Sequence, residues 1–82
     1  MPKGIHDERY RWLMDQLIRA RKDAGLSQTA LATGLGKPQQ FVSRYELGER
    51  RLDIVEYWDV AQMLQLDPDS LAKQMNDVSQ QP

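Results

Sequence analysis

Two neighbouring glutamines, Gln39 and Gln40, carry the chemistry that most needs an explanation. They lie in the segment GKPQQFVSRYELG, residues 36–48, which has a proline near its start and a glycine at its end, as a short helix does. A primary amide holds a hydrogen-bond donor and an acceptor side by side. That combination matches the N7 acceptor and the N6 donor that adenine presents in the major groove of DNA. The segment therefore raises the hypothesis that the two amides face base edges rather than water.

The rest of the chain must form the elements that position this segment. Apolar residues recur at helical spacing throughout, and no stretch alternates with the period of a strand. We therefore expect an all-α fold, a compact arrangement of five helices joined by short turns, in one domain over residues 1–75. The expected helices run from about Asp7 to Ala24, from Ser27 to just before Gly36, from Pro38 to Leu47, from Asp53 onward, and from about Asp67 onward.

Local signals refine these expectations. Pro38 suits the first helical position, and Asp53 with Glu56 three residues later forms an acidic capping-box pair. The polar residues 76–82, NDVSQQP, are expected to form a flexible tail. The residues expected to face inward from the last two helices are Ile54, Tyr57, Ala61 and Leu64, then Leu71 and Met75.

Composition excludes several functional classes. The 82 residues include no cysteine and one histidine, His6, so neither a thiolate nor a histidine-cluster metal site can form, and no nucleophile–base set is present. No apolar run is long enough for a membrane span. We expect a cytoplasmic protein that is not an enzyme, with no cofactor, no metal and no membrane association.

Charge is distributed unevenly along the chain. Residues 1–51 hold ten Lys/Arg and six Asp/Glu, a balance of +4, whereas residues 52–82 hold one Lys and six Asp/Glu, a balance of −5. The net charge of −1 hides this asymmetry. It suggests one region offered to an anion and one turned away from it, although scatter in a small protein is the alternative.

The span QTALATGLGKPQQFVSRYEL, residues 28–47, satisfies the requirements of a helix-turn-helix. Ala32 is small enough for a close helix crossing, and Gly36 can adopt a positive φ in the turn. Apolar residues that would lock the second helix onto the first are Leu31, Leu35, Val42 and Tyr45. Because Val42 and Tyr45 share one face, the polar residues Gln39, Gln40, Ser43 and Arg44 must point largely the other way.

From about Leu17 to Leu71 the sequence resembles the Cro/lambda-repressor type of helix-turn-helix DNA-binding domain. The matching stretches are RARKDAGLSQTALATGLG, QQFVSRYELGERR and VAQMLQLDPDSL, about two-thirds of the chain. The resemblance implies five helices, with the third lying in the major groove of double-stranded DNA. Lys37 departs from the pattern, since an aliphatic residue usually follows the turn glycine.

The resemblance also implies roles for individual residues. Gln28 would contact a phosphate, and an ion pair of Arg21 with Glu46 would join the first helix to the end of the third in a structural role. The flanking cations Lys37, Arg50 and Arg51 would neutralise backbone phosphates, unless the two arginines occupy a solvated turn. The residues at or next to base-edge positions would be Gln39, Gln40, Phe41, Ser43 and Arg44. Two alternatives stay open: Phe41 contacts a thymine methyl or packs into the core, and Arg44 reads guanine or pairs with a neighbouring acid.

The function implied is sequence-specific DNA binding by a transcriptional regulator that represses by occupying its site. We expect a homodimer, with an apolar strip around Val55 and Trp58 as its surface, unless Trp58 packs against Trp12. A second hypothesis is a protein-binding module, in which the acidic residues 52–82 dock a protein partner such as a toxin or a polymerase subunit.

Overall fold

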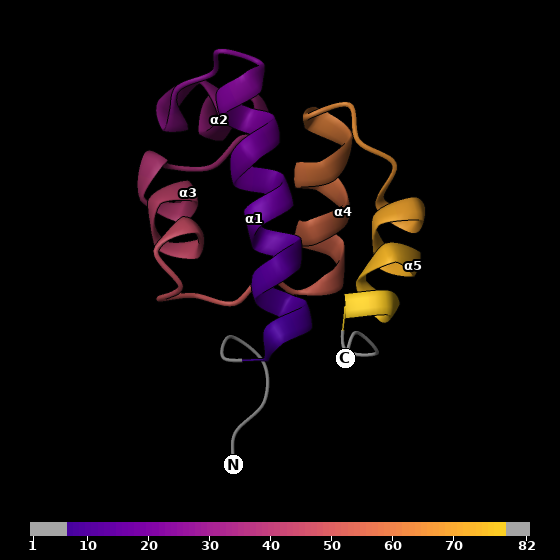
Figure 1. Cartoon of the computed structure of the whole chain (residues 1–82). Coiled ribbons are helices and arrows are strands. Elements are labelled where there is room, and N and C mark those ends of the chain that lie inside the picture. The colour runs from indigo at the N-terminus through magenta and orange to yellow at the C-terminus, as the bar shows by residue number, and fades with distance from the viewer. Residues whose placement is uncertain (1–6, 79–82) are drawn as a thin grey trace.

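The computed structural model describes residues 7–78, which form five α-helices and contain no strand. Figure 1 shows α2 and α3 on one side of the molecule, α4 and α5 on the other, and α1 running across the middle. α1 contacts both α3 and α5, and α2 contacts both α3 and α4. The all-α prediction is confirmed. The helices are α1 (Glu8–Asp23), α2 (Gln28–Leu35), α3 (Gln39–Glu46), α4 (Ile54–Met63) and α5 (Pro68–Val78).

Local capping explains where the helices begin and end. Ser27 Oγ accepts a hydrogen bond from the backbone N–H of Ala30 and so caps α2. Asp53 and Glu56 form the predicted capping box, each side chain accepting from the other residue's backbone N–H. Gly36 ends α2 with φ 71°, a left-handed conformation that an L side chain would strain.

One continuous core holds the helices together. Leu17 from α1, Leu31 from α2, Val42 and Tyr45 from α3, and Val60 from α4 are at most 1% exposed. Isolated helices of eight residues, such as α2 and α3, are too short to be stable in water. They therefore owe their helical state to this shared core, and the core fixes how α3 is oriented.

Three details differ from the sequence-based expectations. Pro38 has ψ 155° and is the N-cap of α3 rather than its first helical residue, because that extended ψ starts the helix at Gln39. Ile54 is 68% exposed rather than inward, since the first residue of α4 lies beyond the edge of the core that Tyr57, Ala61 and Leu64 enter. α5 continues through Val78, which is half-buried, so residues 76–78 are helical, whereas residues 79–82 of the expected tail lie outside the described residues.

Candidate nucleic-acid interface

The two helices α2 and α3 form a tight unit with a short turn. Ala32, the small residue predicted for the helix crossing, is 1% exposed. The backbone N–H of Lys37 donates to the carbonyl of Ala32 at 2.9 Å, which closes the turn after Gly36. This geometry sets the start of α3 at a fixed angle to α2.

The two faces of α3 are chemically opposite. Phe41, Val42 and Tyr45 are buried, with Val42 and Tyr45 0% exposed. Gln39, Gln40 and Arg44 are exposed and Ser43 is partly exposed. The helix therefore offers solvent a row of amide, hydroxyl and guanidinium groups, and its orientation is set by the apolar side chains beneath.

A chain of side-chain hydrogen bonds connects Gln39 to the interior. Gln39 Nε2 donates to Gln28 Oε1 at 2.8 Å, and Gln28 Nε2 donates to Glu46 Oε1 at 3.0 Å. Glu46 also accepts from Arg21 Nε at 2.7 Å and from Arg21 Nη2 at 3.0 Å. This series of hydrogen bonds joins α1, α2 and both ends of α3. Gln39 is therefore held by a hydrogen-bond network rather than by its own rotamer preference.

The ion pair at the inner end of this chain is nearly buried. The side chains of Arg21 and Glu46 are 11% and 8% exposed, and Arg21 Nη1 also donates to the carbonyl of Leu26 at 2.8 Å. Hydrogen bonding to Glu46 raises the pKa of the Arg21 guanidinium. A bidentate pair so enclosed fixes geometry, because any rotation of α3 would break two charge-assisted hydrogen bonds at once.

Gln39 keeps part of its hydrogen-bonding capacity. Its Nε2 has two N–H groups, and the bond to Gln28 uses one of them. The second N–H and the Oε1 acceptor have no hydrogen-bond partner within residues 7–78. One donor and one acceptor remain, which is the pair that adenine requires.

Of the two alternatives left open for Phe41, its burial favours packing into the core. Its ring is 8% exposed and meets Tyr45 edge-on, with ring centroids 5.7 Å apart. Two cations lie over the same ring, Lys37 Nζ at 5.4 Å and the Arg50 guanidinium at 4.9 Å from its centroid. The ring is apolar enough to be drawn into the core, and its remaining face supports the flanking cations.

The flanking cations fall into two groups. Arg50, one of the expected phosphate ligands, is partly exposed and forms a bidentate pair with Glu56 of α4, at 2.9 and 2.8 Å. Hydrogen bonds from Arg50, and from the backbone N–H of Asp53, hold the pKa of Glu56 down at about 2. Lys37, Arg44 and Arg51 are exposed and form no salt bridge within residues 7–78. Three cations thus remain open to an anion on or beside α3.

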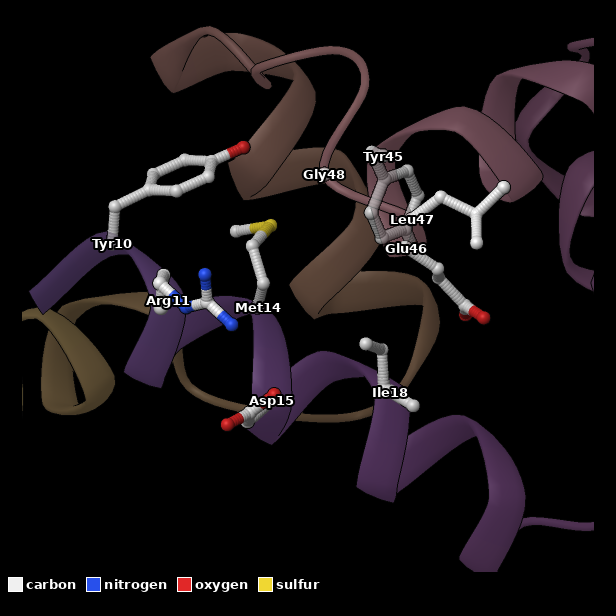
Figure 2. A pocket seen from close by; sticks show the side chains of 9 residues that line it. All are labelled: Tyr10, Arg11, Met14, Asp15, Ile18, Tyr45, Glu46, Leu47 and Gly48. Carbon is white, nitrogen blue, oxygen red and sulfur yellow. The ribbon is translucent and has the colours of Figure 1, made fainter. Parts of the chain in front are cut away.

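A small hollow of about 90 Å³ lies between α1 and the end of α3 (Figure 2). Tyr10, Arg11 and Ile18 approach it from α1, and Glu46 and Leu47 from the end of α3. Tyr45 contributes to its wall, and its buried hydroxyl has no hydrogen-bond partner in the described part of the chain. Burial raises the pKa of that hydroxyl above its usual range, so it stays protonated. The hollow is too small for a ligand of drug size.

Sequence reasoning missed two of the contacts that organise this interface. The bond from Gln39 to Gln28 joins residues on different helices, and the partner of Arg50 is the same Glu56 that caps α4. Glu56 was visible as a capping residue, but its second bond has no sequence signal. Both contacts depend on how α2, α3 and α4 are placed relative to one another.

The fold and this surface define a helix-turn-helix domain whose second helix presents a polar face to solvent. Comparisons with known proteins agree. The sequence model of the family described as Helix-turn-helix matches residues 17–81. A solved structure of an XRE-family like protein from Pseudomonas syringae pv. tomato str. DC3000 is 44% identical, with a TM-score of 0.82 and 89% of each chain covered. Among curated proteins, none matches the chain.

The chain therefore belongs to the XRE and lambda-repressor type of helix-turn-helix family. This is a family of DNA-binding regulator domains rather than of enzymes, and it places the chain in the class of DNA-binding transcription regulators. Within residues 7–78, none of the helices is both long and apolar enough to cross a membrane.

Proposed function

We propose that this protein is a repressor-like transcription regulator that reads a specific duplex DNA sequence with α3 in the major groove. One observation carries the proposal: α3 is held by a buried apolar face and a buried ion pair, while Gln39, Gln40 and Arg44 remain exposed. A major groove about 12 Å wide admits one α-helix with its side chains. The exposed side of α3 then meets base edges.

The three exposed residues have distinct proposed roles. Gln39 donates its second N–H to adenine N7 and accepts from N6, and its bond to Gln28 sets the plane of the amide. Gln40 contacts the neighbouring base edge. Arg44, one turn further along α3, reaches guanine O6 and N7 or a phosphate, and Ser43 lies beside it.

Phosphate contacts position the helix. The first N–H groups of α2, at Gln28 and Thr29, have no intrahelical acceptor and lie at the positive end of the helix dipole. Gln28 also keeps one side-chain N–H beyond its bond to Glu46, so it can hold a phosphate while it orients Gln39. Lys37 and Arg51 neutralise phosphates on either side of α3.

The regulator acts as a homodimer in this proposal. In place of the expected strip around Val55 and Trp58, the proposed surface is the pair Ile54 and Trp58. These residues are four apart on α4, so they lie on the same side of the helix, and they are 68% and 40% exposed. The pair belongs to α4, which Figure 1 shows on the other side of α1 from α3. Two copies joined there would read two half-sites about one helical turn apart, roughly 34–36 Å, in a palindrome. Occupancy of such a site blocks polymerase.

Selection of binding sites from random duplex DNA at near-physiological salt tests the proposal. We expect an enriched palindrome with adenine in each half-site, and an affinity that falls with salt with a log–log slope of about −4 to −7 for four to eight phosphates. A pool that shows no enrichment, or an affinity indifferent to salt, contradicts DNA reading. An enriched half-site without symmetry contradicts only the dimer.

A further inference from the structure

A groove runs along the solvent side of α4, between α4 and the helix-turn-helix unit. One part is a hollow of about 260 Å³ lined by Lys37, and the other is a hollow of about 440 Å³ lined by Met63. Leu35 and Asp59 line both hollows, so the two form one continuous groove. From Val55 to Met63 the α4 wall spans eight residue steps, about 12 Å at 1.5 Å per residue.

The groove has an apolar floor and an open wall. Phe41 and Val60 are buried beneath it, and Leu35 is half-buried at the junction of the two hollows. Val55 and Met63 are 64% and 41% exposed on the α4 wall. These apolar surfaces are unusual for a solvent-facing helix side and are available to a partner.

A glycine keeps the upper end of the groove open. Gly34 lies near the end of α2, and a Cβ at this position would meet the Met63 side chain at 3.1 Å. The glycine lowers the stability of α2 by up to about 1 kcal/mol relative to alanine. In return, it lets Met63 lie against α2 and leaves the groove free of a further side chain.

The charge of the groove identifies its occupant. α4 carries no Lys or Arg from Ile54 to Met63. Its N-cap residue Asp53 and two further acidic residues, Glu56 and Asp59, line the groove. Arg50 neutralises Glu56, but Asp59 forms no salt bridge within residues 7–78. Among the described residues, Lys37, at the border with α3, is the one cation lining the groove. An acidic wall repels DNA phosphates, so the groove suits a positively charged ligand.

We propose that this groove binds a segment of another protein, an apolar stretch of about two helical turns that carries a Lys or Arg to meet Asp59. Apolar side chains of the segment would cover Val55, Leu35 and Met63, as an amphipathic helix does in a hydrophobic groove. Lys37 borders the groove, but Gln39, Gln40 and Arg44 do not line it, so a bound segment leaves these three side chains open to DNA. The inference goes beyond DNA reading and does not depend on it.

Selection of binding peptides from a display library of random twelve-residue peptides, with the full chain as bait, tests the proposal. Selected peptides are then synthesised and titrated into isotope-labelled protein, and the perturbed amide resonances are mapped. We expect enrichment of peptides that combine Leu, Ile or Met with Lys or Arg, and perturbations confined to the groove. Asp59→Asn and Val55→Ser should each weaken binding about tenfold. The matched control, Asp77→Asn on α5, should leave the affinity unchanged.

Other outcomes overturn the proposal. These are the absence of enrichment, peptides that perturb residues outside the groove, or an affinity unaffected by both groove variants while their amide spectra show a native fold. A second copy of this chain is the competing occupant. Sedimentation equilibrium distinguishes the two occupants. If Asp59→Asn and Val55→Ser abolish self-association and Trp58→Ser does not, the groove is a dimer interface, and the proposal of a separate protein partner is wrong. Neither of these results changes the outcome expected from the selection of DNA binding sites, so failure of the groove proposal is distinguishable from failure of the proposed function.

Discussion

α3 and α4 both bury an apolar face in the same core, yet their exposed faces are built from different side chains. α3 exposes Gln39, Gln40 and Arg44, which are polar or cationic. α4 exposes Val55 and Trp58 together with acidic residues such as Asp59, an apolar and acidic mixture. Burial therefore fixes each helix in place, whereas its solvent side sets the partner that we propose for it: base edges and phosphates for α3, and a protein segment for α4.

The attachment of the two helices also differs. α3 is tied to α1 and α2 by the enclosed pair of Arg21 and Glu46, whereas α4 is tied to the preceding loop by the more exposed pair of Arg50 and Glu56. Enclosed pairs are costly to break, and exposed ones contribute little. Single substitutions in α3, in α4 and in the turn between them test how the two helices are attached and what their exposed sides bind.

Glu46→Ala should lower the free energy of unfolding by about 3–5 kcal/mol, because it leaves the guanidinium of Arg21 enclosed without its carboxylate. Urea denaturation followed by circular dichroism measures the change. Glu49→Ala, in the exposed turn that follows α3, is the matched control and should stay within about 0.5 kcal/mol. Equal losses in the two variants would remove the distinction between enclosed and exposed carboxylates.

Gln39→Ala should lose about 1–3 kcal/mol of discrimination at one base position and retain non-specific DNA binding. Competition binding with operators that differ at single positions measures this loss. Gln62→Ala, an exposed glutamine on α4, should leave discrimination unchanged. A uniform loss over all sequences in Gln39→Ala would show that the residue supports the fold and does not read a base.

Acid should weaken the attachment of α4 in a defined window. The pKa of Glu56 is about 2 in the folded chain against an ordinary 4.5, so its contribution is present above pH 4.5 and is lost as pH falls toward 2. Exposure of Arg50 screens the pair, so we expect a contribution well below that of the enclosed pair of Arg21 and Glu46. Unfolding measured from pH 6 to pH 2.5 should show a shallower pH dependence in Glu56→Gln, and identical slopes in both proteins would contradict this assignment.

Arg51→Ala should weaken DNA binding by a similar factor for all sequences, and the magnitude of the salt slope should fall by about 0.9 for each phosphate that is no longer neutralised. Fluorescence anisotropy at several salt concentrations gives the slope. Lys73→Ala, in α5, should leave the slope unchanged because α5 and α3 lie on opposite sides of α1 (Figure 1). A slope altered equally by both variants would mean that overall charge, and not position, governs binding.

Much of the fold was predictable because its signals are local. Ser27, Gly36 and the Asp53–Glu56 box mark helix ends through their own backbone bonds, and the structure contains each of them. The side of α3 that faces the core followed from the spacing of Val42 and Tyr45. Errors fell at the element ends, where Ile54 and Pro38 were misplaced, because one residue of shift costs little energy there.

The candidate site was predictable only in part. Which residues α3 exposes follows from periodicity, and Gln39, Gln40 and Arg44 are exposed as expected. Phe41 could have faced either way, since an aromatic side chain beside a buried stripe has two acceptable environments. In the fold the ring packs in the apolar core against Tyr45, and Lys37 and Arg50 lie over it.

Residue types and their spacing are enough to specify five helices, the turn between α2 and α3, and the polar character of the outer side of α3, because caps, turn glycines and apolar periodicity act over a few residues. The tertiary fold determines that Gln28 holds Gln39, that Glu56 pairs with Arg50, and that α2 and α4 line a groove. Those features join side chains that are distant along the chain, and only the packing of the helices sets the distances between them.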